Sequence, residues 1–328
     1  MNILYIIGNG LDIAHHMKTS YQDFFKYYLS KLSVDGDIIA MKKDIDNNKY
    51  ETWADLEIGM GAYASKCANK GVFLKCLTDI KTNLKEYLKK ESEKIDLYKI
   101  SSLIGFLNPG HFLDPEPRNR YDEWRKSKSS GSVINVMTLN YTSTLEKLLG
   151  FTGVALTYPH NIMLNTIHHI HGTLDDNMMV MGVNDSSQIA NAGFSTDQDV
   201  IEEFVKPEFN DACMNNKNAI GDALIQSAGV IVIYGASLGA SDDRWWKLIG
   251  QRMQSNNPPL LVYLPYDEKK DQAAEPNHLR RWTLGYVNEI RDKFGIQIDE
   301  KVLASRICIA LNKRLFQITK VPHQNNKL

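Results

Sequence analysis

The chain repeatedly places Gly, Asn or His directly after a short run of apolar, mostly β-branched residues. The apolar runs cover residues 3–7, 133–137, 166–167 and 229–234. The residues that follow them include Gly8-Asn9-Gly10, Asn140, His171-Gly172 and Gly235-Ala236-Ser237. Continuous apolar strands separated by helical stretches are typical of a parallel sheet that helices cover on both faces. The sequence therefore predicts an α/β fold with a Rossmann-like parallel sheet, whose ligands bind at the carboxyl ends of the strands.

Helical periodicity interrupts this pattern between the first and second apolar runs. Residues 72–98 carry apolar side chains at helical spacing. Residues 34–50 look like a Lys/Asp-rich connector, and residues 108–132, with three prolines, like a long exposed loop. Short strands are also expected at 178–182 and 260–264. The predicted organisation is an α/β core in 1–34 and 126–321, a mainly helical insertion with an exposed loop in 35–125, and a frayed tail in 322–328.

Composition narrows the classes of function. The formal net charge of −1 gives the molecule no field that attracts nucleic acid or an anionic membrane. The four cysteines form no Cys-x-x-Cys pair, which favours a reduced, cytoplasmic, zinc-free protein. The first apolar run lacks the basic start of a secretory leader, and no apolar stretch approaches the ~20 residues of a membrane span.

Each polar residue at a strand end has a structural explanation beside the functional one. Gly8-Asn9-Gly10 lacks the third glycine of the dinucleotide fingerprint, since position 13 is Ile, and is compatible with a tight turn that binds nothing. Asn140 and Ser237 are compatible with helix caps, although Thr142 can replace Asn140 in that role. His169 and His171 share a strand face, but no nearby Cys, Asp or Glu completes a metal site.

Two further pairs of ionisable residues lie close together in the sequence. Asp12 and His15 lie one turn apart and are able to face the same cleft. Asp55 and Glu57 are two residues apart, which places them on different helix faces and argues against a paired acid and base.

Taken together, these stretches resemble the AbiH family of bacterial phage-defence proteins, whose domain is itself similar to the sirtuin-like NAD-binding fold. Leu11 departs from the family pattern, in which Phe is commoner. The matching residues run in the family's order: Gly8-Asn9-Gly10, Asp12, His15, Thr19, Tyr21, Phe24, Trp53, Asp55, Glu57, Asn140-Tyr141-Thr142, His169-Ile170-His171-Gly172, Gly182, Asn184, Gly235, Ser237-Leu238, Asp242 and Trp245-Trp246.

The resemblance implies an NAD glycohydrolase that cleaves NAD to nicotinamide and ADP-ribose during phage infection. By similarity to sirtuin-like enzymes, Asn140 would orient the nicotinamide ribose and His171 would act as general base, while Asp12 is expected to stabilise positive charge. The zinc ribbon that sirtuins use for acyl-lysine peptides requires two Cys pairs, and this chain has none. The residues expected to bind NAD, the substrate, are Gly8, Asn9, Gly10, Thr19, Thr142, Gly172, Asn184, Gly235, Ser237 and Asp242.

Two other classes of function compete with this one. In the first, the same cleft senses NAD or ADP-ribose without turnover, and the helical insertion recruits a partner. The second is a nuclease, which the neutral net charge and the absence of an acidic metal motif disfavour. We expect a phage-derived trigger, a possible homo-oligomer and no metal requirement.

Overall fold

Parallel strands form the centre of the molecule in a computed structural model that describes residues 1–126, 131–175, 179–267 and 276–320. The predicted tail, 322–328, lies outside the described residues. Seven strands form the main sheet in the order β4-β5-β3-β1-β6-β7-β8, and all pairs except β4–β5 are parallel. Their bounds are β1 Asn2–Ile7, β3 Ser132–Thr138, β4 Leu156–Tyr158, β5 Ile162–His169, β6 Val230–Tyr234, β7 Leu260–Leu264 and β8 Ile307–Ile309. The predicted α/β class with a Rossmann-like sheet is confirmed.

Helices cover both faces of this sheet, because its central strands are apolar on both sides. One face packs against α11 (Lys217–Ser227), α12 (Asp243–Met253), α13 (Pro276–Phe294) and α14 (Glu300–Arg306). The other packs against α6 (Ile104–Leu107), α7 (Pro115–Lys126) and α8 (Thr144–Leu149). All five residues of β6 are buried, as expected for a strand in the middle of a covered parallel sheet.

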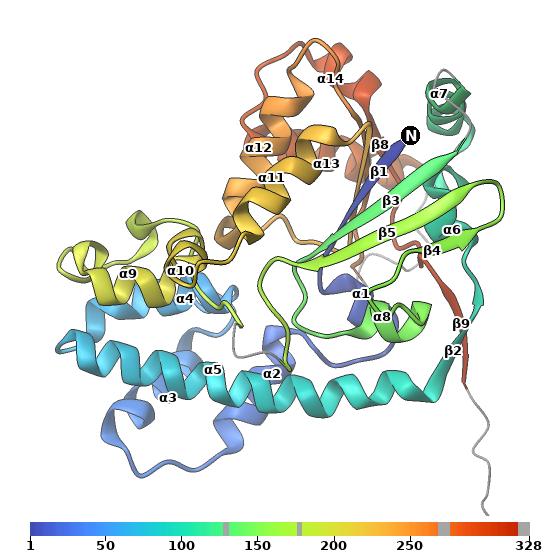
Figure 1. Cartoon of the computed structure of the whole chain (residues 1–328). Helices are drawn as coiled ribbons and strands as arrows, with labels where there is room; N and C mark the ends of the chain where they lie inside the picture. The colour runs from blue at the N-terminus through green and yellow to red at the C-terminus, as the bar shows by residue number, and fades with distance from the viewer. Residues whose placement is uncertain (127–130, 176–178, 268–275, 321–328) are drawn as a thin grey trace, which may run out of the picture.

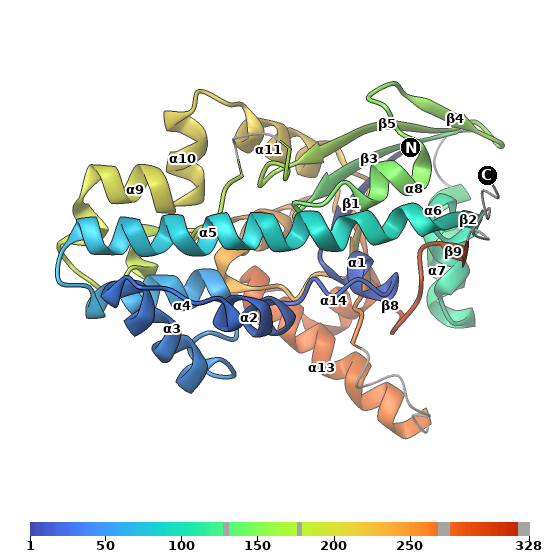
Figure 2. The ribbon, with the colours of Figure 1, turned by 90° about the horizontal axis from the view of Figure 1, so that it is seen from below.

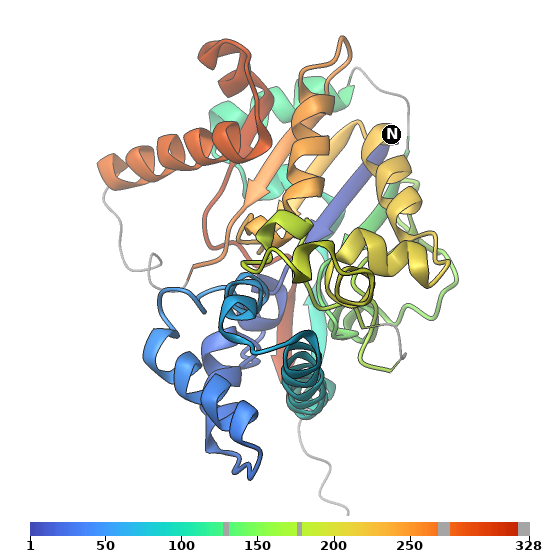
Figure 3. The ribbon, with the colours of Figure 1, turned by 90° about the vertical axis from the view of Figure 1, so that its left-hand side faces the viewer.

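A layer of helices lies across the carboxyl ends of the strands, toward which the arrow of β1 points (Figures 1 and 3). The layer contains α2 (Tyr21–Ser30), α3 (Gly36–Asn48), α4 (Leu56–Tyr63) and the long α5 (Lys70–Ser92), which runs along its whole length (Figure 2). Side-chain caps begin these helices, with Ser20, Asp35, Asp55 and Asn69 each accepting a backbone N–H.

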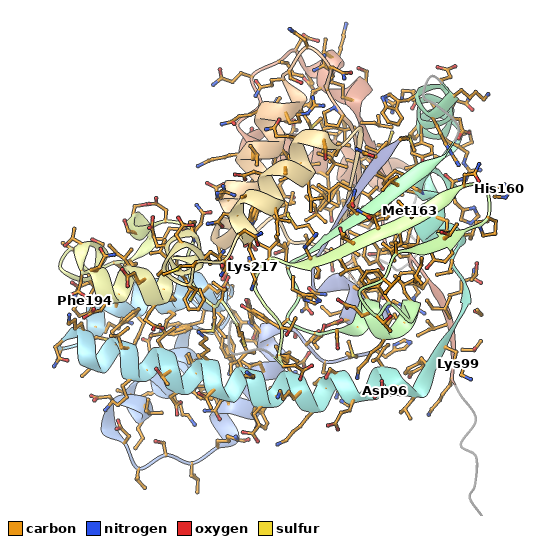
Figure 4. The ribbon with its side chains drawn as sticks, viewed as in Figure 1. Asp96, Lys99, His160, Met163, Phe194 and Lys217 are labelled. Atoms are coloured by element: carbon orange, nitrogen blue, oxygen red, sulfur yellow. The ribbon has the colours of Figure 1, made fainter. Side chains whose placement is uncertain are left out.

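The segment after β5 returns to this layer through α9 (Gln198–Phe204) and α10 (Lys206–Ala212). The layer has its own apolar core, in which Phe73 of α5 packs against Phe204 of α9 with ring centroids 5.3 Å apart. Phe194, which also contacts Phe73, and Asp96 lie toward opposite ends of the layer (Figure 4). Tyr141, Leu174 and other residues that follow the strands belong to the same apolar core. The layer therefore packs directly on the strand ends where a site was expected.

Several local predictions were wrong. Residues 36–48 form α3 instead of a connector. Asp35 caps this helix, and the apolar side chains of Ile38, Met41 and Ile45 are buried. Within the predicted exposed loop, residues 115–126 form α7, which buries Tyr121. Residues 179–182 are not a strand; a backbone bridge joins Val183 to Val205 instead.

A second sheet pairs segments that are far apart in the sequence. Strand β2 (Tyr98–Ser102) runs antiparallel to β9 (Gln317–Lys320). The sequence analysis did not anticipate either strand, because both are short and contain no buried residue. No helix among the described residues has the length and hydropathy needed to cross a membrane.

Candidate functional site

The parallel strands follow the order 3-2-1-4-5-6 when they are numbered along the chain without the edge strand β4 and the small second sheet. In such sheets the winding reverses beside the first strand, and ligands bind at the carboxyl ends near that point. Here the reversal lies between β1 and β6. The turns that follow these two strands, residues 8–10 and 235–237, therefore face each other.

Glycine allows these two turns to touch. Gly8 N donates to Tyr234 O at 2.9 Å, and Gly10 N donates to Gly235 O at 2.8 Å. A Cβ atom on Gly10 would lie only 2.4 Å from Gly235 Cα, closer than any side chain permits. Gly235 itself has φ of +60°, a conformation that favours glycine. In this structure the N–H groups of Gly8 and Gly10 thus bond to protein, and their predicted binding of a phosphate remains a prediction.

Asn9 and Thr19 pair with each other. The Thr19 hydroxyl donates to Asn9 Oδ1 at 2.5 Å, and Asn9 Nδ2 donates to Thr19 O at 2.9 Å. This double contact ties the short helix α1 (Gly10–Ala14) to the segment that leads into α2.

Asp12, on α1, lies at the centre of a partly buried group that we call the acid cluster: Asp12, Thr142, Thr144, Glu146 and His169. The Thr142 hydroxyl donates to Asp12 Oδ2 at 2.7 Å, and the Thr144 hydroxyl donates to Thr142 Oγ1 at 3.2 Å. Asp12 is 1% exposed, and its other oxygen, Oδ1, is buried without a hydrogen-bond partner. Burial raises the pKa of Asp12 to about 6, although hydrogen bonds from Thr142 and Thr144 and the nearby His169 oppose this shift.

Asn140 borders the acid cluster and is held on both sides. Its Nδ2 donates to Gly8 O at 3.1 Å, and its backbone N donates to the Thr138 hydroxyl at 3.1 Å. His169 Nδ1 lies 2.8 Å from Asn140 O, while Nε2 of the same ring lies 2.5 Å from Glu146 Oε1. Asn140 therefore fixes the end of β3 against the turn after β1.

His171 belongs to a different group, the charged cluster: Glu57, His171, Lys206 and Asp242. Lys206 Nζ donates to Glu57 Oε2 at 2.8 Å and to Asp242 Oδ1 at 2.9 Å. His171 Nε2 lies 3.0 Å from the same Asp242 oxygen, although without the in-line geometry of a hydrogen bond. His171, Lys206 and Glu57 are all buried.

The charges of this cluster set its pKa values. Burial opposes ionisation of Asp242, but Lys206 and His171 outweigh that effect and hold the pKa of Asp242 well below its usual range. Burial likewise opposes the charge of Lys206, yet Asp242 and Glu57 raise its pKa above the usual value. Burial raises the pKa of Glu57, because Lys206 offsets only part of the desolvation and Asp242 adds a like charge.

The remaining predicted residues surround these clusters. Gly172 turns the chain after β5 with φ of +75°. Asn184 Oδ1 accepts the backbone N–H of Arg244 at 2.9 Å, which joins its loop to the start of α12. Ser237 is exposed at the turn after β6.

A small pocket opens beside the charged cluster. His171, Asn184, Lys206, Asp242 and Arg244 are among the residues that line it. The space that the protein encloses there is about the size of one water molecule. A nucleotide could therefore enter only if lining side chains moved.

The structure thus divides the predicted site residues between two neighbouring clusters. Tyr141 joins them, because it lies between Asn140 and Thr142 in sequence and its ring centroid is 6.3 Å from that of His171.

Sequence analysis missed Glu146 and Lys206 entirely. Lys206 is the first residue of α10, a position where a lysine ordinarily faces solvent, so nothing local in the sequence marks it as buried. Within the described residues, no three His, Cys, Asp or Glu side chains are arranged to hold a metal ion.

Comparison with known proteins identifies a family for this chain. Residues 4–263 match a family model described as "Bacteriophage abortive infection AbiH", and this range includes every residue of both clusters. The comparison with curated proteins found no match.

Proposed function

The chain belongs to the AbiH family of bacteriophage abortive-infection proteins, and from this premise we propose that it is an NAD glycohydrolase. The proposed reaction breaks the bond between nicotinamide nitrogen and ribose C1′, and the electron pair leaves with nicotinamide. Water forms the new C1′–O bond and gives up one proton to a base. Loss of NAD in the cytoplasm would then end phage replication. We expect a phage-derived trigger to start the reaction, and we expect the protein to associate with itself.

Oδ1 of Asp12 is the observation that carries this proposal. It is a buried carboxylate oxygen without a partner, at the carboxyl edge of a sheet with the strand order of dinucleotide-binding folds. Nicotinamide leaves as a neutral molecule, so the reaction needs no general acid. The ribose becomes cationic in the transition state, and a fixed negative charge in a dry site stabilises it strongly. Ionised Asp12 supplies that charge.

Asn140 and His171 complete the proposed mechanism. Asn140 would orient the nicotinamide ribose, while His171 would remove the proton of the attacking water, a task that suits imidazole near neutral pH. The pyrophosphate and adenosine end of NAD would lie toward Ser237 and the turn at Gly235. Because Asp12 is almost completely buried, binding must displace side chains that cover it.

Nicotinamide release from NAD, followed by chromatography of the purified protein, tests the proposal. Asn140→Ala and His171→Ala should each lower turnover at least ~100-fold, the scale of losing a positioned acid–base group. NAD should still raise the melting temperature of both variants, since a ligand that binds only the folded state stabilises it. Ser237→Trp, at an exposed position, should abolish turnover and the NAD effect while the protein stays folded.

The pH profile provides a second test. Asp12 must be ionised to act, so kcat/KM should fall as pH drops through about 6. A protein that NAD stabilises but that releases no nicotinamide at any pH is a sensor, and the enzyme proposal is then wrong.

A further inference from the structure

The segment Trp53-Ala54-Asp55-Leu56-Glu57 leads into α4 of the helical layer, outside the sheet, and the mechanism above assigns it no task. We propose that Glu57 and Lys206 are positioning residues, which hold His171 in one orientation through Asp242. This inference rests on the proposed function, because the orientation of His171 serves catalysis only if His171 is the general base. It extends the functional unit from the strand ends into the layer that covers them.

Lys206 is the centre of the arrangement. Its ammonium group has three N–H donors, and the structure gives it three acceptors: Glu57 Oε2, Asp242 Oδ1 and Ser241 O, at 2.8, 2.9 and 2.9 Å. The group is therefore saturated and has no donor left for a substrate. A buried, saturated ammonium fixes its acceptors more effectively than it binds anything new.

Glu57 anchors this centre to two other segments. Its second oxygen, Oε1, accepts the backbone N–H of Gly182 at 3.1 Å and lies 3.4 Å from the hydroxyl of Tyr141. The Tyr141 hydroxyl also donates to Val180 O at 2.9 Å. Glu57 is thus held at both oxygens, by residues that lie on either side of His171 in the sequence.

Asp55 fixes the loop that carries Asp242. Its Oδ1 caps α4, and its Oδ2 accepts the Ser241 hydroxyl at 3.2 Å. Ser241 precedes Asp242 directly, and its carbonyl is one of the acceptors of Lys206. Two carboxylates of one short segment therefore control the position of Asp242.

The fixed position of Asp242 in turn restricts the orientation of the His171 imidazole. The oxygen that accepts from Lys206 lies 3.0 Å from His171 Nε2. Contacts of this kind are often poorly aligned in a free enzyme and tighten in the complex. A proton on Nε2 that faces Asp242 leaves Nδ1 as the acceptor, which is the form a general base requires. Buried ion clusters seldom add net stability, so a role in orientation explains this one better than a role in folding.

The test compares Glu57→Gln with Glu91→Gln in the full-length protein. Glu91 is a matched control, because it is also a buried glutamate paired with a lysine, Lys94, but it belongs to neither cluster. Two readouts apply: nicotinamide release, and the ring ¹⁵N signals of His171, which report which nitrogen carries the proton. Glu57→Gln should lower kcat 10- to 100-fold, change KM for NAD less than about twofold, and convert the His171 signals from one tautomer to a mixture. Glu91→Gln should leave kcat and the His171 signals as in the parent protein.

A second variant, Lys206→Arg, covers the case in which Glu57→Gln does not fold. It keeps a cation for both Glu57 and Asp242, so this protein should fold, but a planar guanidinium cannot reproduce the three contacts of the ammonium group, so kcat should fall in the same way. Either variant with parent-like kcat and a single His171 tautomer would overturn the inference. If the parent protein releases no nicotinamide, the proposed function fails, and the ¹⁵N signals alone still decide whether Glu57 and Lys206 orient His171.

Discussion

Asp12→Asn tests the charge at the centre of the acid cluster. The substitution keeps the shape of the side chain, including an oxygen that can accept from Thr142, and removes only the ability to ionise. The pKa of Asp12 is raised from 3.8 to about 6, so the folded state binds a proton more tightly than the unfolded state. Stability contributed by the neutral carboxyl is complete below pH 3.8 and is lost as pH rises through about 6.

The size of the effect follows from the same shift. Proton binding is linked to folding, so the raised pKa of Asp12 lowers the free energy of unfolding by about 1.6 kcal/mol at pH 5 and by about 3 kcal/mol at pH 7.5, relative to a side chain that stays neutral. The Asn variant does not pay this cost, so its free energy of unfolding should exceed that of the parent by amounts of this order, and the difference should grow with pH. Nicotinamide release should fall at least ~100-fold in the same protein.

Urea unfolding at pH 5 and pH 7.5 measures the difference, with the m-value as a check that the same surface is exposed. Asp242→Asn is the control of opposite sign. Because the pKa of Asp242 is lowered, its charge adds stability above the unfolded pKa of 3.8, and this variant should be less stable at pH 7.5. An Asp12→Asn variant that is less stable than the parent at pH 7.5, or whose difference does not change with pH, would refute the reasoning about Oδ1.

Three further outcomes follow from the contacts. Gly10→Ala should cost about 1–3 kcal/mol or more, because its Cβ would lie 2.4 Å from Gly235 Cα, whereas Gly36→Ala, with nothing within 4 Å, should cost little in the same urea titration. Lys206→Met should lower the free energy of unfolding by about 3–5 kcal/mol, because it leaves two buried carboxylates without their cation, while Lys70→Met, at an exposed pair, should cost below about 1 kcal/mol. Chelators should leave nicotinamide release unchanged and elemental analysis should find no stoichiometric zinc; zinc that co-purifies at one equivalent would contradict the proposed mechanism.

The chemistry of the two clusters also explains how one helical layer can serve two roles. It provides an apolar core of its own, and it supplies Glu57 and Asp55 to the strand ends. Movement of the layer would therefore alter the contacts that surround Asp242. A trigger that acts on the layer would reach His171 through the charged cluster, which makes Glu57→Gln informative for regulation as well as for catalysis.

The sequence by itself determined the elements that depend on local pattern. Apolar runs that are buried on both faces identify β1, β3, β6 and β7 within one or two residues, because a covered parallel strand consists mostly of apolar residues. The order of motifs along the chain also identified the family, since the match extends over residues 4–263. The caps at Ser20 and Asp55 are also local contacts, over two or three residues, but the sequence analysis did not predict them and placed Asp55 within a helix, whereas it precedes α4.

Tertiary structure alone decided how the site residues are grouped. Asn140 and His171 follow adjacent strands, yet one joins Gly8 and the other joins Asp242, because side-chain direction at a strand end depends on what packs beyond it. Gly8 and Gly10 donate to Tyr234 O and Gly235 O, more than two hundred residues away, and sequence spacing cannot reveal those contacts. Lys206 is the clearest case, because its burial is tolerable only when Glu57 and Asp242 arrive from two other elements. Charge compensation of that kind exists only after the chain has folded.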